Sequence, residues 1–153
     1  MTTQTETRTR RWQSTAQALQ LGVGLQVVCL LLPLLDLWFF GSIEGHVQDA
    51  YPEWGADDVA LDRNAIAITL VVIGVLGLAG WFGALWAAKR DRGVRATVTT
   101  LFALGMGTLT VVAGVGGEPY DQYVPLWLGT TILLVMALPA VTALLAVWFR
   151  GRD

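Results

Sequence analysis

The chain has 153 residues, of which 54% are hydrophobic and only 14% are charged, and its formal net charge is −2. This composition is typical of a membrane protein and leaves no room for a separate soluble globular domain. The chain has a single cysteine, Cys29, which excludes a framework of disulfides within the chain.

Four long apolar segments follow one another along the chain, at residues 19–40, 65–88, 96–117 and 126–149. At about 1.5 Å per helical residue, each is long enough to cross a hydrocarbon core of about 30 Å. We therefore predict an all-α membrane protein, an antiparallel four-helix transmembrane bundle that occupies residues 15–150. Residues 1–14 lack hydrophobic periodicity and are predicted to form a flexible cytoplasmic tail.

The first apolar segment is predicted to be a retained membrane anchor. Basic residues precede it, as they do in a secretory signal peptide. However, its apolar run is too long for one, and Trp38, Phe39 and Phe40 stand where small residues would lead to a cleavage site.

Charge is separated sharply between the two sides of the predicted bundle. One side carries nine of the ten basic residues, namely Arg8, Arg10, Arg11, Lys89, Arg90, Arg92, Arg95, Arg150 and Arg152. The other side carries eight acidic residues, namely Glu44, Asp49, Glu53, Asp57, Asp58, Asp62, Glu118 and Asp121, with Arg63 as its one basic residue. Because cytoplasmic loops are enriched in Lys and Arg, we predict a multi-pass protein of the cell membrane with both termini in the cytoplasm.

The outer loop, residues 41–64, is the longest connection between predicted spans. It gathers four residues whose side chains can ligate a divalent cation, namely Glu44, His46, Asp49 and Glu53. Their spacing fits no defined calcium loop, and a single histidine is poor support for a zinc site. We favour a solvated acidic loop that reinforces topology, and predict no metal site.

One face of the first span is more polar than the opposite, leucine-rich face. Gly22, Gln26, Cys29, Pro33 and Asp36 recur at intervals of four and three residues, which places them on one helical face that should point into the bundle. Asp36 is the only ionisable residue within the four predicted spans. Two interpretations follow: a hydrogen-bonded structural group, which we favour, or a proton or cation site in which Asp36 titrates.

The second and third spans carry stripes of small residues. The residues are Gly74, Gly77, Gly80 and Gly83 on the second span, and Thr100, Ala103, Gly107, Thr110 and Gly114 on the third. Small side chains let helix backbones approach closely within a membrane. We favour packing within the chain, with a dimer interface as the alternative.

Several functional classes lack their required residues. The single histidine, His46, lies in a loop, which excludes a haem-carrying bundle, and one cysteine excludes a quinone-linked thiol oxidoreductase. We predict no enzyme, no cofactor and no nucleic-acid partner, because the basic residues are accounted for as topology signals. Low lysine content and abundant Ala, Gly and Val favour a prokaryotic source.

The predicted function is that of a small interaction or accessory protein, with the lipid bilayer and either itself or another membrane protein as partners. The alternative is a small proton- or cation-coupled transporter, in which Asp36 titrates and Gln26 and the Cys29 carbonyl line the path.

Overall fold

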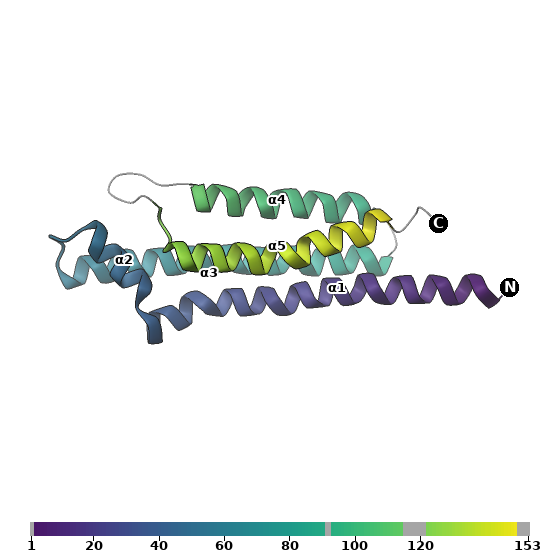
Figure 1. Ribbon diagram of the computed structural model, residues 1–153, viewed down its shortest axis with the longest axis horizontal. Coiled ribbons are helices and arrows are strands. Elements are labelled where there is room, and N and C mark those ends of the chain that lie inside the picture. The colour runs from purple at the N-terminus through teal and green to yellow at the C-terminus, as the bar shows by residue number, and fades with distance from the viewer. Residues whose placement is uncertain (1, 91–92, 115–121, 150–153) are drawn as a thin grey trace.

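The computed structural model describes residues 2–90, 93–114 and 122–149, with the backbone alone for residues 2–15 and 113. Every element in these ranges is helical, as predicted. Four of the helices are long and apolar enough to cross a membrane, and they run alongside one another (Figure 1). The elements are α1 (Thr2–Leu35), the π-helix η1 (Asp36–Phe40), α2 (Ser42–Ala50), α3 (Ala56–Arg90), α4 (Val94–Gly114) and α5 (Leu126–Trp148).

The helix boundaries depart from the predicted spans mainly at the beginnings of α1 and α3. α1 starts at Thr2, so residues 2–14 are helical, which the prediction of a flexible tail did not anticipate. α3 starts at Ala56 and contains the last part of the predicted outer loop. Asp57 and Asp58 lie in its first turn, and Lys89 and Arg90 in its last, so their charges oppose the helix dipole at both ends. The predicted end of the third span at Gly117 lies outside the described residues.

The predicted outer loop also contains a helix that the sequence interpretation missed. α2 presents Ile43 and Val47, four residues apart, on one face, and both are fully buried. They pack with Val59 and Ile66 of α3 and with Leu128 of α5. α2 therefore covers one end of the long helices (Figure 1).

α1 and α3 approach each other closely where glycines face the neighbouring helix. A Cβ atom on Gly22 of α1 would overlap the Trp81 ring of α3. A Cβ on Gly77 of α3 would lie 2.9 Å from the Gln26 Oε1 of α1. A larger residue at Gly22 would therefore have to displace the Trp81 ring, whereas one at Gly77 would have to shift only the amide end of Gln26.

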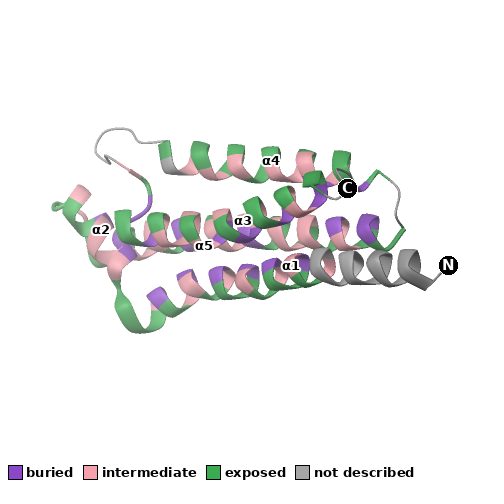
Figure 2. Ribbon diagram, turned by 45° about the vertical axis from the view of Figure 1, so that its right-hand side comes forward, coloured by how far each residue is buried: buried purple, intermediate pink, exposed green. Residues whose placement is uncertain are grey.

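α4 is the least buried of the four long helices. Only 11% of its apolar segment is buried, against 22% to 28% of the other three, and its outward side is exposed along its length (Figure 2). It contacts α3 and α5, and the Trp148 Nε1 of α5 donates a hydrogen bond to the Thr99 Oγ1 of α4 (3.1 Å). α4 is thus attached along one face and leaves the other free within the described chain.

The α1–α3 contact predicts that leucine lowers the stability of the protein at one glycine of α1 and leaves it unchanged at another. Gly22→Leu should lower the free energy of unfolding by about 1–3 kcal/mol, because the new side chain displaces Trp81. Gly24→Leu is the matched control, since Gly24 is exposed and a Cβ there meets nothing within 4 Å. Thermal unfolding of both variants in the same detergent measures the difference; equal midpoints for the two would contradict this close approach.

Candidate functional site

The polar face of α1 points into the protein. Gly22, Gln26, Cys29, Pro33 and Asp36 are all buried. The two polar side chains of this face, Gln26 and Asp36, lie in different parts of the structure and contact different helices. Asp36 lies at the end of the long helices that α2 covers, whereas Gln26 lies near their middle, against α3.

Asp36 binds the beginning of α2. Its Oδ2 accepts a hydrogen bond from the Ile43 backbone N–H (2.8 Å). Its Oδ1 accepts one from the Ser42 backbone N–H (3.3 Å) and another from the Ser42 hydroxyl. The carboxylate therefore caps the N-terminus of α2 from six and seven residues earlier in the chain, and a negative charge at this position also opposes the helix dipole.

A local break in the helix brings Asp36 into this position. Within one turn of Pro33, which cannot donate a backbone hydrogen bond, α1 gives way to the wider π-helix. Gly41 then adopts a left-handed conformation (φ 63°), and its N–H bonds to the Asp36 carbonyl (2.8 Å). Trp38, Phe39 and Phe40 project outward from the π-turn and are 66% to 75% exposed, as expected of rings at a headgroup interface.

The four residues of the outer loop that could ligate a cation do not converge on one point. The Arg63 guanidinium donates to the Glu44 carboxylate at 2.6 Å, and the His46 Nε2 lies 2.6 Å from the Gln122 carbonyl oxygen. Asp49 and Glu53 are exposed. Among the described residues, no three His, Cys, Asp or Glu side chains gather in a way that could hold a metal ion. Glu44 and His46 instead connect α2 to α3 and to the segment before α5.

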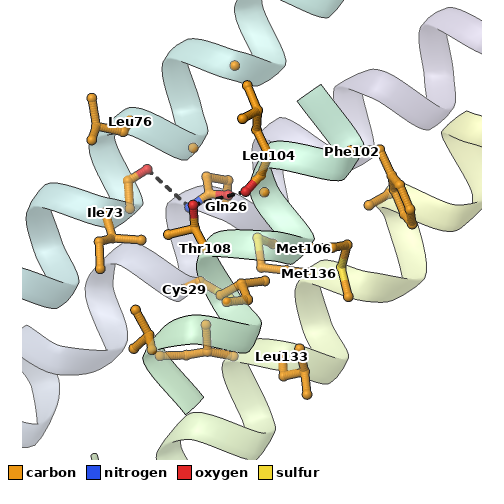
Figure 3. A pocket seen from close by; sticks show the side chains of 18 of the residues that line it. Gln26, Cys29, Ile73, Leu76, Phe102, Leu104, Met106, Thr108, Leu133 and Met136 are labelled. Atoms are coloured by element: carbon orange, nitrogen blue, oxygen red, sulfur yellow. Dashed lines mark hydrogen bonds between the residues drawn. The ribbon is translucent and has the colours of Figure 1, made fainter. Parts of the chain in front are cut away.

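A cavity of about 400 Å³ lies among the four long helices, and the sequence interpretation did not predict it. Its lining is mainly apolar, and it includes Gln26 and Cys29 but neither Pro33 nor Asp36. Figure 3 shows Gln26 and Cys29 with labelled lining side chains of the other helices, namely Ile73, Leu76, Phe102, Leu104, Met106, Thr108, Leu133 and Met136.

Gln26 is the buried polar side chain of this cavity. It is 7% exposed, and its Nε2 donates a hydrogen bond to the Gly74 carbonyl oxygen of α3 (3.1 Å; Figure 3). Cys29, one turn further along α1, is also buried. The polar periodicity of α1 indicated which face is buried. It could not indicate the cavity, because that depends on how far α4 stands from α1.

The two predicted small-residue stripes have different surroundings. On α3, Gly74 is buried against Leu30 of α1, and Gly80 and Gly83 lie near Leu101 of α4. On α4 every member of the stripe is exposed, namely Thr100, Ala103, Gly107, Thr110 and Gly114. A Cβ atom on Gly107 or Gly114 would meet nothing within 4 Å among the described residues. The structure thus packs the α3 stripe within the chain and leaves the α4 stripe on the outer surface.

No family model, curated protein or solved structure matches this chain.

The cap on α2 predicts a graded loss of stability at Asp36. Asp36→Ala should lower the free energy of unfolding by about 1–3 kcal/mol, because the buried Ile43 N–H loses its acceptor. Asp36→Asn keeps one side-chain oxygen and should lose less. Thermal unfolding checks this order against Asp49→Ala, a change at an exposed carboxylate. An Asp36→Ala protein as stable as the Asp49→Ala control would contradict the capping role.

Proposed function

We propose that this chain is a small multi-pass protein of the cell membrane that acts by packing against itself or against another membrane protein. In this proposal α1, α3, α4 and α5 form an antiparallel transmembrane bundle with both termini in the cytoplasm. The four long apolar helices support a membrane location. The short connection between Arg90 and Val94 supports antiparallel neighbours, and the separated charges support the orientation.

The observation that carries the proposal is the exposed stripe on α4. In a bilayer there is no hydrophobic driving force between helices, so association depends on close backbone approach at small residues and on hydrogen bonds between helices. The stripe offers two glycines, an alanine and two threonines on one outward face. The Thr110 hydroxyl already donates to the Met106 carbonyl oxygen of its own helix (2.8 Å), so it adds no unpaired donor to this face. Such a surface suits a second helix better than it suits lipid chains.

No comparable observation favours the transporter alternative. The Asp36 side chain is fully buried and holds three hydrogen bonds from Ser42 and Ile43. It does not line the cavity that Gln26 lines. A carboxylate whose two oxygens are both engaged by the first residues of α2 is suited to a structural role.

The orientation predicts which engineered thiols react from outside the cell. In a chain with Cys29 replaced by Ser, Asp57→Cys should react with a membrane-impermeant maleimide on intact cells, whereas Arg95→Cys should react only after permeabilisation. Both positions are exposed, so accessibility within the protein does not separate them. Labelling of Arg95→Cys on intact cells would reverse the proposed topology.

The α4 stripe predicts a partner contact that a single side chain can block. A photo-crosslinking residue at Thr110 should give discrete protein adducts in native membranes, either with a second copy or with another membrane protein. Gly107→Leu, three residues away on the same face, should reduce these adducts on the order of tenfold, because it prevents close approach.

The matched control is Gly24→Leu, since Gly24 is likewise an exposed glycine with open space around it, but on α1. It should leave the adducts unchanged. Adducts that persist in Gly107→Leu, or that appear with lipid alone, would overturn the proposal that α4 is the contact surface.

A further inference from the structure

The cavity described above extends along the helices. Its lining runs along α5 from Leu126 to Ala143, which at 1.5 Å per residue is about 25 Å. A site of this length with a mainly apolar lining has the reach and the chemistry to hold an extended hydrocarbon chain.

The cavity also reaches the outer surface of the helices. Its lining includes Leu76 of α3, Leu104 of α4 and Leu126 of α5, which are 63% to 69% exposed. Leu76 and Leu104 lie within the apolar segments of their helices, so in a bilayer the opening between α3 and α4 faces hydrocarbon. A ligand that enters there comes from the membrane.

Gln26 gives this apolar space one unused polar group. Its Nε2 bonds to the Gly74 carbonyl oxygen. No described residue donates a hydrogen bond to its Oε1, and because no fully buried side-chain N or O atom in the described residues lacks a partner, this oxygen is accessible from the cavity. The side chain is 93% buried and lines the cavity. An amide oxygen without a donor is unfavourable in apolar surroundings, so a ligand that brings an O–H or N–H group to this point gains an interaction that plain hydrocarbon cannot make.

We propose that the cavity binds a single-chain membrane lipid that carries a hydrogen-bond donor, such as a long-chain alcohol. The chain lies along α5, and its donor bonds to the Gln26 Oε1. This site differs from the α4 stripe, because Gly105 lines the cavity and Gly107 belongs to the outward face, about 200° away around the helix. The inference rests on the membrane location in the proposed function but not on the proposed partner contact.

Photoreactive hexadecanol and photoreactive hexadecane, each carrying a diazirine at the same carbon, test the proposal with the full chain in lipid vesicles. Adducts mapped by mass spectrometry should concentrate on cavity residues such as Met106, Leu133 and Met136. The alcohol should label them about two- to tenfold more than the alkane, as one added hydrogen bond allows.

Gly105→Leu, with Gly107→Leu as its control, tests whether the cavity is occupied, and Gln26→Leu tests the hydrogen bond to the ligand. Gly105→Leu puts a side chain into open space at the cavity wall and should reduce cavity labelling by both probes about tenfold, whereas Gly107→Leu should not. Gln26→Leu, of similar size, should remove the preference for the alcohol while labelling by the alkane continues. If Gln26→Leu fails to fold, the Gly105→Leu and Gly107→Leu pair still decides whether the cavity is occupied.

Labelling confined to outward side chains such as Leu138, and insensitive to Gly105→Leu, would overturn the cavity site. Equal labelling by alcohol and alkane in the unsubstituted protein would overturn the role of Gln26 and indicate that water satisfies its oxygen. If the chain passes the maleimide test but shows no cavity adduct, the ligand proposal fails while the membrane proposal stands.

Discussion

The hydrogen bonds between Asp36 and the start of α2 hold together the end of the molecule that α2 covers. At Gly41 the chain leaves η1, and a new helix begins whose first N–H groups have no partner within that helix. The Ile43 N–H is one of them and is buried, so the fold requires an acceptor at this point. Asp36 provides it, and α2 can then place Ile43 and Val47 against α3 and α5. The contacts of Glu44 and His46 with neighbouring elements depend on the same placement.

The small residues of α3 and α4 have different consequences for packing: those of α3 face a closely packed neighbour, and those of α4 do not. Glycines on α1 and α3 bring these two helices into close contact through Trp81, Gln26 and Leu30. α4 carries a stripe of five small residues, yet it presents this stripe outward and is the least buried long helix. α4 therefore borders both remaining surfaces with functional potential, the cavity on its inner side and the exposed stripe on its outer side.

Much of this fold follows from hydropathy, because long apolar segments have few alternatives to helices in a membrane. The polar face of α1 was also predictable, since five residues at helical spacing mark one side whatever it packs against. α2 was missed because nine residues rich in polar groups resemble a solvated loop, and its helix forms against α3 and α5 rather than by its own propensity. The outward direction of the α4 stripe could not be predicted, because small residues suit contacts within and between chains equally well. The cavity depends on a separation between α1 and α4 that no local pattern encodes.

The different surroundings of Asp36 and Gln26 follow from what each side chain requires when it is buried. A buried carboxylate is unfavourable unless its oxygens accept hydrogen bonds, and Asp36 has three donors within two adjacent residues. Such a group has little left to offer a ligand. A neutral amide is easier to bury, and Gln26 is held by a single hydrogen bond from its nitrogen to α3 while its oxygen stays unused. The carboxylate of Asp36 is thus fully engaged in holding α2, whereas the amide of Gln26 is better placed to recognise a molecule from the bilayer.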